Sequence, residues 1–197
     1  MRHKGKTIAE FKGGEIQFPV AETGDDYLEV VTKGQGRLYY YMQTEGISAT
    51  GNYTEEDRFI KVRRQFFDRT GRKINGQSFS VNDLVIVQVS LERAFSGNVD
   101  NIVITDVLPA GFEIENPRTK EIPGMEWIKD ADEPVAMDVR DDRLNLFVDL
   151  RANRQVYYYA VRAVSPGVFK LGPIGADAMY NGEYHSYNGG GVVTINP

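Results

Sequence analysis

The stretch Val85-Ile86-Val87-Gln88-Val89-Ser90-Leu91 decides the fold class. Its valines and its leucine recur at every second position, and side chains of a β-strand alternate between the two faces of a sheet. The stretch therefore predicts a strand with one face in a core.

Similar alternation recurs on both sides of this strand. Turn-forming residues such as Ser96-Gly97-Asn98 and Asp141-Asp142 separate the strands, and short strands at such spacing are typical of an antiparallel sandwich. We therefore expect an all-β, immunoglobulin-like antiparallel β-sandwich, in which Arg64 is a misfit on an otherwise apolar face. The alternating sets are Ile60, Val62 and Phe66; Ile102 and Ile104; Leu144, Leu146 and Val148; Val156, Tyr158 and Ala160; and Ile174, Ala176, Ala178 and Tyr180.

The polar stretch 46–57 marks a domain boundary, and we expect one domain over 1–52 and a second over 53–197. The first would hold only three strands, at Ile16–Val20, Tyr27–Thr32 and Arg37–Thr44. Three strands are stable only when something covers their apolar face. The first segment is therefore expected to be part of a domain whose remainder lies elsewhere, or to pack on the second domain.

Composition excludes several classes of function. The chain has 197 residues, no cysteine and two histidines, which removes disulfides, thiol nucleophiles and thiolate zinc sites. A net charge of -5 argues against a nucleic-acid binder. No apolar run approaches the ~20 residues of a membrane helix. No acid, base and nucleophile can be assembled, so we expect no enzyme. We also expect no cofactor and, because the apolar runs are short, no direct membrane insertion.

Aromatic residues leave a second interpretation open. Trp127 and the loop Tyr184–Tyr187 would suit a carbohydrate-binding or adhesion module. The triplets Tyr39-Tyr40-Tyr41 and Tyr157-Tyr158-Tyr159 each split across two faces of a strand, so that one or two rings of each enter the core.

Several stretches together resemble the C-terminal part of bacterial alpha-2-macroglobulins, in the order that the family has them, over about residues 33 to 180. The most specific is Val99–Pro117, which contains Asp106-Val107-Leu108-Pro109-Ala110-Gly111-Phe112 and is similar to the terminal macroglobulin-like domain, called MG10. The other matching stretches are Lys33–Tyr40, Arg58–Asp68, Arg140–Arg143, Tyr157–Val164 and Ala176–Tyr180.

The resemblance implies a role that composition does not show. Bacterial alpha-2-macroglobulins are large exported protease inhibitors, usually periplasmic and often lipid-anchored, whose last domain packs on the thioester domain and shields the thioester from water. The expected partners are therefore that thioester domain and the proteases that the parent protein traps. Residues 1–52 would be the final strands of the domain flanking the thioester domain. Because the chain lacks the Cys-x-x-Gln thioester motif, we expect it to be a fragment.

Met179 and Tyr180 are the candidate shielding residues. A flexible thioether and an aromatic ring can cover a reactive group and exclude water. Tyr180 as the last core residue of the strand Ile174–Tyr180 is an equally open interpretation.

Overall fold

The computed structural model describes residues 1–17, 27–41, 43, 53–115 and 125–197. The chain divides into two compact units, Met1–Ile47 and Ser48–Pro197. The division into domains 1–52 and 53–197 stays a prediction. In the described part of the chain, no helix is long and apolar enough to cross a membrane.

The first unit contains a small antiparallel sheet in the order β2-β1-β3. Of the strands expected here, only Tyr27–Thr32 overlaps one, β3. Residues 16–17 and 37–41 are not in strands, so the expectation is wrong for them, while 18–20, 42 and 44 lie outside the described residues. The strands are β1 (Arg2–His3), β2 (Lys6–Thr7) and β3 (Leu28–Glu29).

The tyrosine triplet of the first unit is exposed. Tyr39, Tyr40 and Tyr41 are each more than 80% exposed, so the expectation that some of these rings enter a core is wrong. The reason is that residues 37–41 join no sheet, and the alternation of a strand buries a ring only where a second layer covers that face.

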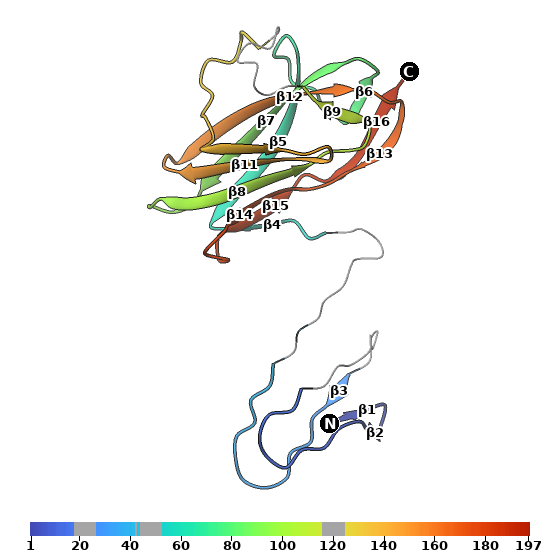
Figure 1. Cartoon of the computed structure of the whole chain (residues 1–197), viewed down its shortest axis with the longest axis vertical. Helices are drawn as coiled ribbons and strands as arrows, with labels where there is room; N and C mark the ends of the chain where they lie inside the picture. Colours follow the sequence, from blue (N-terminus) through green and yellow to red (C-terminus); the bar gives the residue numbers. More distant parts are fainter. Residues whose placement is uncertain (18–26, 42, 44–52, 116–124) are drawn as a thin grey trace. The chain divides into compact units, whose positions relative to one another are not determined.

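The second unit is a sandwich of β-sheets, as the sequence predicted (Figure 1). Its six-stranded sheet has the order β10-β11-β8-β14-β15-β4, its four-stranded sheet the order β5-β7-β12-β9, and its three-stranded sheet the order β13-β16-β6. Among the described strands of this unit, β16 and β6 pair in parallel and the others pair antiparallel. The strands are β4 (Glu56–Arg58), β5 (Ile60–Asp68), β6 (Ser78–Ser80), β7 (Leu84–Arg93), β8 (Val99–Val107), β9 (Phe112–Ile114), β10 (Ala136–Val139), β11 (Arg143–Leu150), β12 (Arg154–Ala163), β13 (Gly167–Leu171), β14 (Ile174–Ala178), β15 (His185–Asn188) and β16 (Gly191–Asn196).

The core lies between the two larger sheets, and most of the predicted inward faces are confirmed. Every second residue of β7 from Val85 to Leu91 is fully buried in it, as are Ile102 and Ile104 of β8. The remaining core side chains are Ile60, Val62, Phe66, Phe79, Val99, Leu108, Phe112, Leu144, Leu146, Val148, Leu150, Tyr157, Tyr159, Val161, Ala163, Leu171, Ile174, Ala176, Ala178, Val193 and Ile195.

The structure corrects the predicted inward face of strand β12. Tyr157 and Tyr159 point into the core, whereas the predicted set with Tyr158 lies on the opposite face. That opposite face looked apolar because it is also partly covered. Trp127 packs edge-on against Tyr158, with ring centroids 5.9 Å apart, and in a tilted arrangement against Phe67, with ring centroids 5.4 Å apart. A strand covered on both faces gives no sequence signal that separates them.

Candidate functional site

The turn between β14 and β15 is firmly held although it is exposed. The Met179 N–H donates to the carbonyl oxygen of Asn101 at 2.9 Å, which ties the first turn residue to β8. The Ala178 N–H donates to the Tyr184 carbonyl at 3.0 Å, and the Asn181 N–H to the Ala178 carbonyl at 3.1 Å. These bonds hold the backbone of the turn at several points, so its side chains project from a defined framework.

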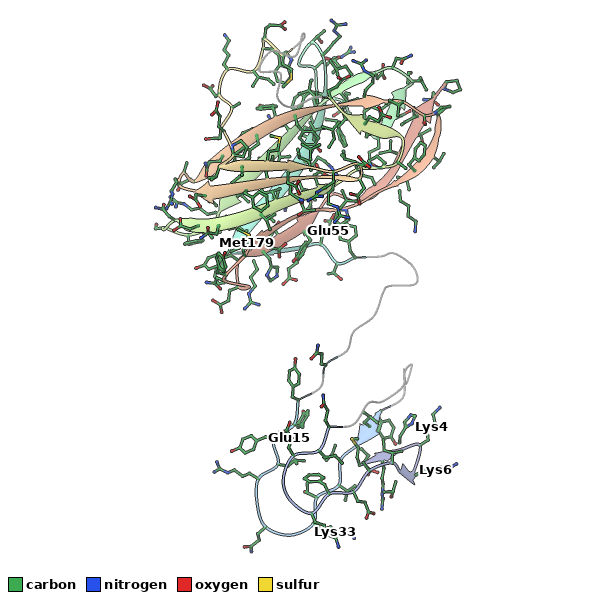
Figure 2. The ribbon with its side chains drawn as sticks, in the orientation of Figure 1. Lys4, Lys6, Glu15, Lys33, Glu55 and Met179 are labelled. Carbon is green, nitrogen blue, oxygen red and sulfur yellow. The ribbon has the colours of Figure 1, made fainter. Side chains whose placement is uncertain are left out.

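Both candidate shielding residues lie on this turn with their side chains open to solvent. Met179 is 44% exposed and Tyr180 is 84% exposed, and Figure 2 shows Met179 at the end of the hairpin. The interpretation of Tyr180 as the last core residue is wrong, because β14 ends at Ala178 and the alternation stops there. The shielding role of the two residues stays a prediction.

A cluster of three aromatic rings supports the base of the turn. The ring of Tyr184 lies 5.4 Å from Phe59 and 5.4 Å from Phe95, measured between centroids. Phe59 is 49% exposed and has a φ of 62°, a left-handed conformation that is rare for a bulky residue. It stands between β4 and β5, where the chain leaves the six-stranded sheet for the four-stranded one. The alternation of apolar residues in the sequence did not single out Phe59.

Strand β15, which follows the turn, carries the second half of the predicted aromatic loop Tyr184–Tyr187. The Tyr187 hydroxyl donates to the Asp177 carboxylate on the neighbouring strand. Burial and then this hydrogen bond raise the pKa of Tyr187 to about 12. His185 Nδ1 lies 2.9 Å from the Gly182 carbonyl, and its Nε2 lies 3.4 Å from Glu56 Oε1. These polar groups therefore already have partners within the protein.

The structure does not bring together the two parts of the proposed carbohydrate platform. Trp127 packs on Phe67 and Tyr158 of the four-stranded sheet. Tyr184 and Tyr187 belong to the hairpin of the six-stranded sheet, where their rings pack on Phe59, Phe95 and His185. A sugar ring could not stack on both groups at once.

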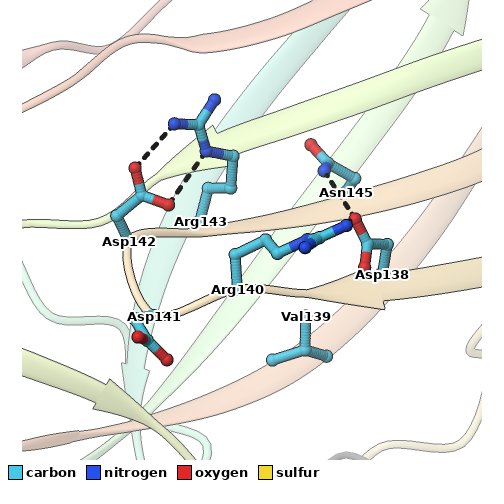
Figure 3. Close-up of a pocket in the computed structure, with 7 residues that line it drawn as sticks. All are labelled: Asp138, Val139, Arg140, Asp141, Asp142, Arg143 and Asn145. Carbon is cyan, nitrogen blue, oxygen red and sulfur yellow. Dashed lines mark hydrogen bonds and ion pairs between the residues drawn. The ribbon is translucent and has the colours of Figure 1, made fainter.

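A polar hollow lies elsewhere, at the turn between β10 and β11, where Asp141-Asp142 form the predicted turn. Figure 3 shows Arg143 facing Asp142, with a shortest N–O distance of 2.6 Å, and Asn145 donating to Asp138. Arg143 lowers the pKa of Asp142, and Arg140 lowers that of Asp138. Both carboxylates are thus neutralised by neighbouring side chains, and no group of acids or histidines in the described residues is arranged to hold a metal ion.

Comparison with known proteins gives consistent matches. The family described as "Bacterial Alpha-2-macroglobulin MG10 domain" matches residues 60–183. Alpha-2-macroglobulin of Pasteurella multocida is 25% identical over 190 residues, which are 95% of this chain and 9% of that protein. The chain thus spans about a tenth of the length of this relative.

Two solved structures have the same fold. The crystal structure of Salmonella alpha-2-macroglobulin reacted with methylamine aligns with a TM-score of 0.63 and 23% identity, over 74% of this chain and 10% of that one. The native conformation of Escherichia coli alpha-2-macroglobulin aligns with a TM-score of 0.65 and 19% identity, over the same shares of the two chains.

Proposed function

Since the chain belongs to the bacterial alpha-2-macroglobulin family through its MG10 domain, we propose that it is a non-catalytic domain that packs on the thioester domain of a parent protease inhibitor and shields it. The observation that carries this proposal is the pair Met179 and Tyr180, which are exposed on a turn whose backbone is fixed. An exposed apolar pair on a rigid support suits a contact with another domain.

The chemistry of a thioester explains why such a cover is useful. Its carbonyl carbon is attacked by water or by an amine; the new bond forms there as the C–S bond breaks, and a free thiol is released. A methionine and a tyrosine ring over this carbon would exclude water and small amines, because neither side chain offers a solvated path to it. The Salmonella relative has been captured after reaction with methylamine, which makes the same amine the natural probe.

The first unit fits a part of a neighbouring domain. Its exposed aromatic residues, Tyr27, Tyr39, Tyr40 and Tyr41, are each more than 80% exposed, an apolar surface that a larger domain would cover. In this proposal residues 1–52 are the final strands of the domain flanking the thioester domain. The parent protein traps proteases in the periplasm or elsewhere in the cell envelope.

The test uses a parent protein that carries the thioester. Replacing Met179→Ala together with Tyr180→Ala should speed the reaction with methylamine, followed as thiol released over time. The matched control is Val168→Ala, which removes an exposed apolar side chain from β13 and should leave the rate unchanged. An unchanged rate in the double variant would refute the shielding role.

A further inference from the structure

A charged side chain lies inside the sandwich, at the position that broke the apolar pattern. Arg64 on β5 points inward and forms an ion pair with Asp106 on β8, and each side chain is only 2% exposed. The hydroxyl of Tyr159 on β12 donates to the other oxygen of Asp106 at 2.6 Å. A buried charge is tolerated only where it is paired and hydrogen-bonded, as it is here. The pair links the two sheets across the core.

The same guanidinium also holds the base of the hairpin that carries Met179 and Tyr180. Arg64 Nη2 donates to the carbonyl oxygen of Gly172 at 2.8 Å and to that of Gly189 at 2.6 Å. Gly172 lies just before β14, and Gly189 follows directly after β15. One side chain of the four-stranded sheet therefore forms hydrogen bonds with both ends of the hairpin. The planar fork of arginine, with its five N–H donors, can serve several acceptors in this way.

Further contacts join the hairpin, between its base and its tip, to β5 and to the residues just before β5. The fully buried hydroxyl of Ser186 accepts a hydrogen bond from the Val62 N–H at 3.0 Å and donates to Asp57 at 2.7 Å. Nearer the turn, Phe59 forms a bridge with His185 and packs against Tyr184. The hairpin is thus fastened along the edge strand of the opposite sheet, and Arg64 makes the charged contacts at the base of the hairpin.

We infer that Arg64 is a positioning residue that fixes the β14–β15 hairpin, and with it the Met179–Tyr180 turn, to the four-stranded sheet. The fixing follows from contacts within the chain. Its consequence for the thioester rests on the proposed function, because a turn that shifts on its support would cover a reactive carbon less well.

The direct test measures hydrogen exchange of backbone amides in this chain. The variant Arg64→Met, Asp106→Leu, Tyr159→Phe replaces the buried charges by apolar side chains of similar size, a change that often preserves folding. It removes the bonds to Gly172 and Gly189, so amides of β14 and β15 should exchange about tenfold faster or more, as expected when charged hydrogen bonds are lost. Amides of β7 should keep their wild-type rates.

The control is Tyr159→Phe alone, which weakens the ion pair but leaves both carbonyl contacts of Arg64 in place. In this control, amides of β7 and of the hairpin should exchange faster to the same extent, so the hairpin should not open selectively. Equal protection of the hairpin in the triple variant and the wild type would overturn the inference. If the triple variant does not fold, Arg64→Lys replaces it with the same readout, because a compact ammonium does not reproduce the fork.

A second measurement separates this inference from the proposed function. In the thioester-bearing parent, the triple variant should react faster with methylamine, as should Met179→Ala with Tyr180→Ala. If only Met179→Ala with Tyr180→Ala speeds the reaction, shielding stands and the consequence of the Arg64 contacts for the thioester is refuted. If the latter pair has no effect, shielding fails, while the exchange measurement still decides whether Arg64 fixes the hairpin.

Discussion

Two tyrosines on one strand should respond in opposite ways to loss of the hydroxyl. Tyr159 donates to the buried Asp106 carboxylate at 2.6 Å, and burial, followed by that carboxylate, raises the pKa of Tyr159 well above its usual value, so the proton stays on. Tyr159→Phe keeps the ring and removes a hydrogen bond to a charged group, which costs about 1.5–3 kcal/mol of unfolding free energy. For a unit of this size the Tm should fall by about 3–12 °C.

Tyr157 is the matched control, two residues earlier on β12. It is 2% exposed, and its hydroxyl has no hydrogen-bond partner among the described residues. Tyr157→Phe therefore removes a buried polar atom at no cost in bonding, so stability should be unchanged or rise by about 1–3 kcal/mol. Urea unfolding followed by circular dichroism measures both variants. Equal losses for the two would show that the hydroxyl of Tyr159 contributes no more than that of Tyr157, and would refute the network as described.

Two further substitutions test local packing and charge. Gly111→Ala should lower the unfolding free energy by about 1–3 kcal/mol through overpacking, because the new Cβ would lie 2.5 Å from Phe169 Cε2. Gly182→Ala is the control: it has open space around it and should be neutral in the same urea titration. For Asp68, hydrogen bonds led by that of Thr70 lower the pKa from 3.8 to about 2, so the stabilisation by the carboxylate is present above pH 3.8 and is lost as the pH falls through 2. The stability difference between wild type and Asp68→Asn should therefore shrink over that interval, and a difference independent of pH would contradict the assignment.

The sandwich was predictable from sequence wherever the core face of a strand carries apolar residues at every second position. Val85, Val87, Val89 and Leu91 do so because one face of β7 lies on the core, and the prediction from this stretch is confirmed, although Ile86 and Ser90 on the opposite face are buried as well. The same rule fails at Tyr180, because alternation marks faces and does not mark where a strand ends. It fails for Tyr39–Tyr41 as well, since a period of two buries a ring only if a second layer is present.

The contact turn could be predicted only in part. The resemblance to the family directed attention to Met179 and Tyr180, and the structure places both on an exposed turn. Phe59 and its left-handed backbone were missed, because the change from one sheet to the other between β4 and β5 depends on the pairing of β4 with β15, more than a hundred residues later in the chain. Long-range pairing of this kind leaves no local pattern.

Arg64 shows how a misfit can itself be informative. It falls on the inward face of its strand, and Asp106 falls on the inward face of Ile102 and Ile104, so two strands each carry one charge where an apolar residue is expected. Neither position makes sense alone, because an isolated buried charge is too costly to persist. Two such charges of opposite sign explain each other if their strands lie in facing sheets, as β5 and β8 do. Inward charges on separate strands of a sandwich are therefore best interpreted together, as a constraint on which strands face each other across the core.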